Sequence, residues 1–499
     1  MEVFLSFLVF ILPIIFILTI FSNKIEKLIF FLLNFFTSRA PTIENISFTS
    51  NPEFFKGTVY SHNLHVGDLL ALVFLFFGVL RKEFRKYYTL LPSGTFAVVI
   101  YGLSSAASLV NASDLTFDRS MYALSMHLRQ ILFFYCLANY LRIPMRREYQ
   151  LKSFFFIAVY TMFVGLHQRY ILNKYRIAAD FPHPNAMVFY LVPSLVIFIS
   201  LFFNYKESGY DKRICMAAIS ALLLSSLMSI SRGFVIHFGV AISTVVIIDM
   251  IFKFNLRKPI IILSTVVAMM FLSMKAWDTW YHRIFHESNP VGTAQRKSYY
   301  LVGYEVLKEN LYFGIGINQF GSNGYKLNIL NKVLEYESIK KDAHAQNFIN
   351  TIRGKVIREM ANPDAVLKNV YSGGTPESFY VLHFAETGLV GMFGTMFCQI
   401  FFVLSAFRSL IYFRRRNIFY YSLSLGLVGA QLGIYAQSIL EYILRQEQSM
   451  YLQAILFAMV SSITAVRKSK KFHHVDLRKK QNVKGEDLPP PLPKLNLDP

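Results

Sequence analysis

The chain has 499 residues, of which 54% are hydrophobic and only 16% are charged, and its mean hydropathy is +0.39. Soluble domains carry about 25% charged residues, so the composition excludes an ordinary soluble protein. The apolar residues fall in blocks of about 16 to 25, the length of helix that crosses a hydrocarbon core about 30 Å thick. Because a bilayer offers no water to unpaired backbone groups, such blocks must be helical. The sequence therefore predicts an all-α polytopic membrane protein.

The apolar blocks predict about twelve membrane-spanning helices. In chain order they cover residues 2–21, 66–80, 93–110, 120–141, 153–168, 186–203, 214–231, 233–252, 259–276, 378–405, 418–440 and 449–466. The first block lacks a basic segment before it, so we expect a retained helix and not a cleaved signal peptide. All three cysteines lie in apolar blocks, so no disulfide framework is expected.

The net charge of +21 is distributed in a way that indicates membrane orientation and not nucleic-acid binding. Alternate connections between the predicted helices, together with the C-terminal tail, carry more than half of the 51 lysine and arginine residues. Lysine and arginine accumulate in cytoplasmic connections, so both termini are predicted to be cytoplasmic. The basic excess then faces anionic membrane lipid, and we expect no nucleic-acid partner.

This orientation divides the chain into nine helices, a large extracytoplasmic loop, three further helices and a tail, at residues 1–276, 277–377, 378–466 and 467–499. The loop has mixed charge and an apolar stripe at helical spacing between Ser298 and Glu309, so it is expected to be mostly helical. The tail is basic and proline-rich and is expected to be disordered.

Two arginines are unusual for their position among the predicted spans. Arg129 lies near the middle of a span, and the one other basic residue within the predicted spans is Lys275, at the very end of 259–276. At the centre of a bilayer such a charge costs about 2.5–3.5 kcal/mol on insertion scales. Arg129 either bonds to carbonyl groups of neighbouring helices or lines a polar cavity. Arg232 lies in a tight hairpin between two spans, at the predicted extracytoplasmic face. There it binds a lipid headgroup, a fixed diphosphate or only water.

The large loop and its exit carry further candidate residues. Arg296 precedes the predicted loop helix and is either a solvated helix-end residue or an anion ligand. His344 is a candidate imidazole base in the same loop. Glu377 stands at the predicted outer membrane surface, where a carboxylate is also favoured simply by the helix macrodipole. Glu386 follows at the top of the tenth span.

The connection between the fifth and sixth predicted spans is basic, although it lies on the side where basic residues are scarce. It contains Arg169, Arg176, His183 and Asn185. This departure from the orientation bias suggests an anionic ligand. Guanidinium groups suit diphosphate oxygens because they are permanently charged and bond two oxygens at once. A carboxylate or imidazole nearby can take a proton from a sugar hydroxyl.

Five short motifs follow one another between residues 165 and 405. They are His183-Pro184-Asn185, Ser231-Arg232-Gly233, Arg296 early in a large outer loop, Gly314-x-Gly316-x-x-x-Phe320 and Glu386-Thr387-Gly388-Leu389-x-Gly391. Their order and their membrane sidedness resemble the O-antigen ligase/polymerase family of bacterial inner-membrane proteins. The earlier helices match this family only in being hydrophobic.

The resemblance implies a GT-C-like membrane fold and transfer of a glycan from an undecaprenyl diphosphate carrier. The acceptor is lipid A–core in the ligases and another lipid-linked repeat unit in the polymerases. It also implies that Arg232 and Arg296 hold the diphosphate. We assign Arg169 and Arg176 to the same diphosphate site, and supporting roles to His183, Asn185, Arg129 and Glu386.

The resemblance leaves the general base open. In the family a His-Asn pair usually stands shortly before the Glu-Thr-Gly segment. Here Glu377 and Ser378 hold that place, while His344 and Asn347 come earlier, across an insertion. The base is therefore either Glu377 or His344, and the departure weakens the ligase assignment against the polymerase one. The outer segments contain no Asp-x-Asp pair, so we expect no metal and no cofactor.

Two functions of other classes remain as alternatives. A transporter or flippase of lipid-linked sugars would explain the helix count and Arg129. The nine-to-three division of the helices and the lack of an internal repeat are unlike two equal transporter halves. A non-catalytic scaffold for envelope assembly would tolerate alanine at Arg232 and Arg296.

Overall fold

The computed structural model describes residues 23–39, 42–47, 54–55, 58–59, 63–65, 68, 87–114, 117–205, 210–253, 290–323, 326–361 and 376–469. The predicted spans 2–21 and 259–276, all of 66–80 except Asp68, and most of the tail lie outside these ranges. The region before the large loop contains α2 (Asn23–Arg39), α5 (Thr95–Ala106), η1 (Ala107–Asn111), α6 (Phe117–Tyr140), α7 (Pro144–Leu166), η3 (His167–Ile171), α8 (Pro184–Phe203), α10 (Lys212–Met228) and α11 (Arg232–Phe252).

The large loop and the last helices complete the described fold. They comprise α14 (Pro290–Glu309), α15 (Phe320–Asn323), α16 (Leu327–Glu335), α17 (Glu337–Lys340), α18 (Ala343–Ala361), α20 (Phe379–Phe413), α21 (Ile418–Leu440), η5 (Ile443–Arg445) and α22 (Glu447–Lys468). The predicted all-helical character is confirmed, apart from two short antiparallel strand pairs that join β1 (Thr42–Ser47) to β4 (Asn63–His65) and β2 (Phe54–Phe55) to β3 (Thr58–Val59). Both pairs are polar or very short, so they lack the apolar alternation that signals a strand.

Six of the predicted spans are confirmed as helices long and apolar enough to cross a membrane. They are Arg146–Ile171, Pro184–Phe203, Arg232–Phe252, Phe379–Phe413, Ile418–Leu440 and Glu447–Lys468. The predicted spans 93–110, 120–141 and 214–231 are also helical, but α5 and α10 are shorter and α6 is more polar. Large apolar side chains such as Phe96, Leu128 and Phe393 are exposed on these helices, as expected where lipid covers them. The chain is a helical membrane protein.

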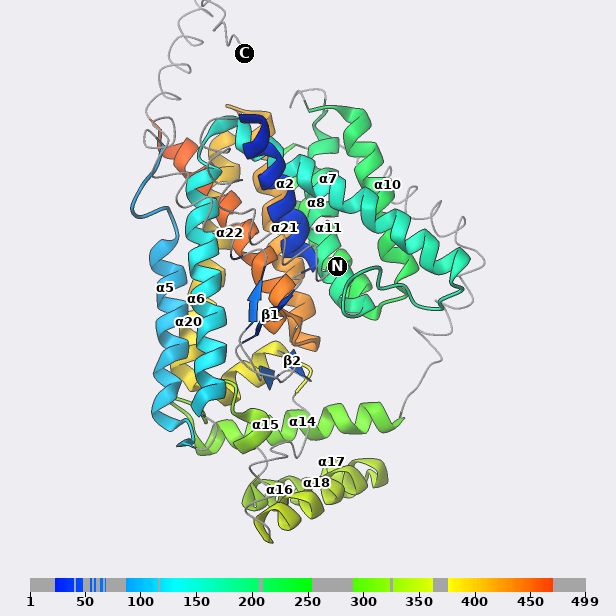
Figure 1. Cartoon of the computed structure of the whole chain (residues 1–499), viewed down its shortest axis with the longest axis vertical. Helices are drawn as coiled ribbons and strands as arrows, with labels where there is room; N and C mark the ends of the chain where they lie inside the picture. The colour runs from blue at the N-terminus through cyan, green and yellow to red at the C-terminus, as the bar shows by residue number, and fades with distance from the viewer. Residues whose placement is uncertain are drawn as a thin grey trace, which may run out of the picture.

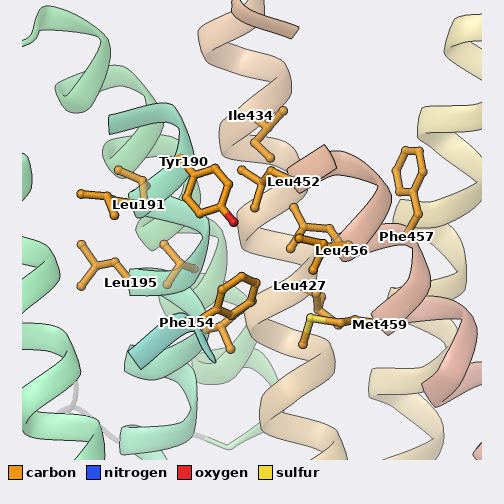
Figure 2. Close-up of a cluster of buried hydrophobic side chains, with 14 of the residues drawn as sticks. Phe154, Tyr190, Leu191, Leu195, Leu427, Ile434, Leu452, Leu456, Phe457 and Met459 are labelled. Atoms are coloured by element: carbon orange, nitrogen blue, oxygen red, sulfur yellow. The ribbon is translucent and has the colours of Figure 1, made fainter. Parts of the chain in front are cut away.

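The core of the bundle surrounds α8, which is buried from Ala186 to Leu201. A helix that is apolar all round must be enclosed by other helices. Figure 2 shows side chains of α8 meeting those of α21 and α22 in a continuous apolar cluster. Glycines allow close contact: a Cβ at Gly426 would lie 2.7 Å from Ile197 of α8, and one at Gly433 would lie 2.5 Å from His237 of α11. Small residues at helix interfaces let membrane helices approach in this way.

The described part of the large loop is helical and has a hydrophobic core of its own. Val302 and Val306 of α14 pack with apolar residues of α16 and α18, and Leu382 of α20 joins them. Figure 1 shows α14 lying across one end of the bundle, with α16, α17 and α18 beyond it; we call this end the loop end. The helix prediction from Ser298 was too short, because α14 begins at Pro290. Proline is favoured at the first helical position, and Arg296 therefore lies inside α14.

The two glycine motifs of the sequence dock against each other at the loop end. α20 has a non-helical kink at Gly388, with φ 64° and ψ −163°. The backbone amide of Gly316 donates to the carbonyl of Glu386 (2.9 Å), and that of Leu389 donates to the carbonyl of Leu311 (2.9 Å). Gly314 has φ +67°, and a Cβ there would lie 2.3 Å from the backbone of Glu386. The kink and the loop thus form one interlocked unit.

Replacing Gly314 with alanine is expected to destabilise the protein. The positive φ alone costs about 1–3 kcal/mol for a residue with a side chain, and the contact with Glu386 adds to this cost. Gly354→Ala is the matched control, because a Cβ at Gly354 of α18 meets nothing within 4 Å, and alanine favours a helix interior by up to about 1 kcal/mol. Thermal unfolding in detergent measures both. Equal melting temperatures for the two variants would contradict this role of Gly314.

Candidate functional site

The loop end is where α8, α11, α20 and α22 begin and where α21 ends. Hydrogen bonds tie these ends together. Asn185 of α8 accepts from the Ser231 hydroxyl (2.6 Å) before α11 and donates to the Glu441 carboxylate (2.7 Å) after α21. The backbone amide of Phe379 on α20 donates to the carbonyl of Glu441 (3.3 Å). Each helix N-terminus carries about half a positive charge, so this junction favours a negatively charged ligand.

Glu441 occupies the centre of the junction. Its carboxylate accepts hydrogen bonds from the amide groups of Asn185 (2.7 Å) and Gln437 (3.3 Å). Burial raises the pKa of Glu441 to about 7, and the negative charge of Glu377 acts in the same direction. The Gln437 hydrogen bond and the charges of Arg296 and Arg176 oppose the rise. Near neutral pH this carboxyl group is therefore about half ionised.

Arg296 and Glu377, predicted separately, form an ion pair. The Arg296 Nε and Glu377 Oε2 atoms lie 2.5 Å apart, with the side chains 54% and 36% exposed. Tyr300 lies one helical turn after Arg296. Burial and the charges of Glu377 and Glu441 raise the pKa of Tyr300, while Arg296 opposes this. The loop helix α14 thus brings an arginine and a tyrosine to the end of α21.

Arg232 is the first residue of α11 and is exposed. The next residue, Gly233, packs so tightly that a Cβ would lie 2.5 Å from Gln437 Nε2 and 3.1 Å from Glu441 Oε1. Consecutive Cα atoms are about 3.8 Å apart, so the backbone of Arg232 lies beside the Glu441 carboxylate. The backbone of Arg232 and the charge of Arg296 therefore reach the same carboxylate from two different elements, although 64 positions separate the two residues in the chain.

The other two predicted diphosphate ligands differ in their surroundings. Arg176 donates to the Asn185 side chain (3.4 Å), and its charge acts on Glu441. Arg169 donates to the backbone carbonyls of Lys174 (3.2 Å) and Tyr175 (2.7 Å) within its own connection. The structure thus brings Arg176 to the junction, and it shows Arg169 bracing the connection that carries Arg176.

His183 and Asn185 both hold helix ends in place. The His183 Nδ1 atom accepts from the amide of Ala186 (3.3 Å) and caps α8, while its Nε2 atom lies 3.1 Å from the Gln446 side chain just before α22. Burial and the charge of Arg176 lower the pKa of His183 to about 4, so it is neutral at physiological pH. Its role in the described structure is positional.

Glu386 is buried and belongs to the interlocked unit formed by the kink of α20 and the loop with Gly314 and Gly316. Its carboxylate forms an ion pair with Arg445 (3.0 Å). It also accepts from the backbone amides of Asn318 (2.9 Å) and Phe320 (3.1 Å). These contacts join α20, the loop and η5, so the residue supports the site by fixing three chain segments.

Arg445 also lines a small cavity between α5, α6, α20 and α22. The lining residues are Tyr101, Ala123, Met126, His127, Ile317, Phe379, His383, Leu444, Arg445 and Met450. Because Glu386 neutralises Arg445 and most other walls are apolar or aromatic, the cavity does not suit a diphosphate.

Arg129 forms ion pairs with two carboxylates, partners that neither reading of the sequence named. It contacts Glu447 at the start of α22 and lies 3.2 Å from Asp68. A buried charge in a membrane segment is tolerated when it is paired. Sequence inspection could not reveal these partners, since Asp68 and Glu447 belong to distant parts of the chain.

His344 lies apart from the junction. It is exposed at the start of α18, where its backbone amide donates to Asp342 (3.1 Å). Figure 1 shows α18 on the far side of α14 from the bundle. In the part of the chain that the structure describes, Glu377 is thus the predicted base that lies with the arginines. No group of three metal-ligating side chains gathers within the described ranges.

Sequence reasoning missed Glu441, Tyr300 and Gln437. Glu441 directly follows the predicted span 418–440, on the side where the arginines gather, and an acidic residue in that position was the available signal. Gln437 lies one turn earlier on α21, and its Oε1 atom accepts a hydrogen bond from His237 Nδ1 (2.8 Å). A neutral amide near the end of a span carries no comparable signal.

No protein-family model matches the chain, and no curated protein is significantly similar to it.

Proposed function

We propose that the protein transfers a glycan from undecaprenyl diphosphate to a sugar hydroxyl at a membrane surface, as O-antigen polymerases and ligases do. The observation that carries this proposal is the junction at the loop end. The charges of Arg296 and Arg176 act on one carboxylate there, and the backbone of Arg232 lies beside it at the N-terminus of a membrane helix. Such a surface suits a diphosphate at the depth of a lipid headgroup.

The reaction needs stabilisation of negative charge on the leaving group. When the bond between the sugar and the diphosphate breaks, charge builds on the diphosphate oxygens. Arginines held in place beforehand stabilise this charge more strongly where water is partly excluded. The Arg296–Glu377 ion pair and the packing of Gly233 against Glu441 hold the guanidinium-bearing segments in position. In this proposal the arginines supply the positive charge, so transfer is metal-independent.

The proposed location follows from the distribution of basic residues. With both termini in the cytoplasm, the loop helices and the junction face the periplasm of a bacterial inner membrane. The flippase alternative was supported by the helix count and by the presence of Arg129 within a predicted span. Its pairing with Asp68 and Glu447 supports a structural role for this arginine, and we therefore favour glycan transfer.

Purified protein supplied with defined undecaprenyl diphosphate-linked repeat units is expected to form new glycosidic bonds. Ladders of products without lipid A–core would indicate a polymerase, and single transfer to lipid A–core would indicate a ligase. The products are resolved by electrophoresis and mass spectrometry. Movement of the labelled donor across vesicles without any new glycosidic bond would instead support the flippase alternative and refute the proposal.

A further inference from the structure

The two carboxylates at the junction differ in their immediate partners, which decides what each can do. The carboxylate of Glu377 is bound by the guanidinium of Arg296 (2.5 Å). The carboxylate of Glu441 is bound by the neutral amides of Asn185 and Gln437. The pairing leaves Glu377 engaged with the arginine whose guanidinium it holds in place, whereas Glu441 is held by neutral amides.

Glu441 is also held rigidly from both sides. Asn185, which donates to it, is itself oriented by the Ser231 hydroxyl (2.6 Å). Gln437, the second donor, is oriented by His237 (2.8 Å). The backbone carbonyl of Glu441 accepts from the amide of Phe379. A proton acceptor works best in a fixed position next to the reacting hydroxyl.

We propose that Glu441 is the general base of the transfer reaction and that Glu377 positions Arg296. This inference rests on the proposed function. The hydroxyl of the acceptor sugar gives its proton to the Glu441 carboxylate while its oxygen forms a bond to the anomeric carbon of the donor. The bond between that carbon and the diphosphate oxygen breaks, and the diphosphate leaves with the electron pair near Arg232 and Arg296. Glu441 afterwards releases the proton to water.

The environment of Glu441 sets the pH at which it works. Glu377, Arg296 and Arg176 are the charged groups whose fields act on it. Tyr300 and Tyr442 are the nearby phenols, and their own pKa values are raised. Only the ionised carboxylate accepts a proton, so the transfer rate should fall as the pH drops through about 7, approaching tenfold per pH unit.

The test compares pH–rate profiles of purified full-length variants with saturating lipid-linked donor. Glu441→Gln keeps an oxygen for the Asn185 hydrogen bond but cannot take a proton, so the rate should fall by about 10²–10⁴. The acidic limb of the pH–rate profile, which is the fall in rate as the pH drops through about 7, should also vanish. Glu441→Asp should be slower yet keep the limb. Glu377→Gln removes a neighbouring negative charge, so the limb should remain and move to lower pH. Glu337→Gln, on exposed α17, is the control and should match the wild type.

The outcomes separate this inference from the proposed function. If the wild type forms no glycosidic bond, the proposed function fails, and the assignment of Glu441 fails with it. If the wild type is active and Glu441→Gln keeps its rate and its limb, only the assignment of Glu441 is overturned. Loss of the limb in Glu377→Gln alone would make Glu377 the base. Binding of labelled donor to Glu441→Gln, measured in parallel, should be retained and shows that the variant is folded.

Discussion

Replacing Arg296 with alanine is expected to lower the rate of glycan transfer by about 10²–10³, the usual cost of removing one group that stabilises charge in the transition state. Arg296 is half exposed and pairs with Glu377 at the junction, so its loss should leave the fold intact. The same loss is expected for Arg232→Ala. The measurement is the initial rate of glycosidic bond formation with saturating undecaprenyl diphosphate-linked donor.

Two further variants define what the arginine contributes. Arg296→Lys keeps the charge but loses the planar, two-pronged geometry, so it should recover only part of the rate. Arg353→Ala removes an exposed arginine of α18 and should leave the rate unchanged. Normal glycan assembly by Arg296→Ala and Arg232→Ala would rule out the diphosphate site and would favour a scaffold.

Replacing Glu386 with alanine is expected to destabilise the protein by about 3–5 kcal/mol, because it leaves a buried arginine without its partner. Glu386 and Arg445 are almost fully buried, with side chains 1% and 9% exposed. The substitution also leaves the backbone amides of Asn318 and Phe320 without an acceptor. Equilibrium unfolding in detergent gives the change in free energy of unfolding.

The double variant Glu386→Ala with Arg445→Met separates the charge from the hydrogen bonds. Without the buried positive charge, it should recover at least about 1 kcal/mol relative to Glu386→Ala alone. The remaining deficit reports the two backbone amides. A single variant as stable as the wild type would show that Glu386 does not hold the loop against the kink of α20.

The membrane helices could be predicted because hydrophobic length is a local property of the chain. A block such as 186–203 is apolar all round, and it becomes the central helix α8. The apolar stripe with Val302 and Val306 likewise predicted a loop helix that packs on a core. The start of that helix was misplaced, since the residues before Ser298 lack the apolar stripe and only Pro290 marks the N-terminus of the helix.

The partners of the charged residues could not be predicted, since they depend on how distant helices pack. Arg296 and Glu377 were both candidate residues, yet nothing local indicated that they would pair. The arrangement around Arg129 needed Asp68 and Glu447 from other elements. Glu386 looked like a supporting residue of the site and proved to hold the interlocked glycine motifs together.

The sequence by itself determined that this is a helical membrane protein, because bilayer insertion depends on runs of residue types. That the candidate arginines lie on one side of the membrane stays a prediction from the distribution of basic residues. Only the tertiary structure decided which carboxylate meets those arginines. Glu441 comes to Asn185 and Gly233 through the close packing of α21 between α8 and α11. That packing depends on the shapes of whole helix faces, which no short stretch of sequence specifies.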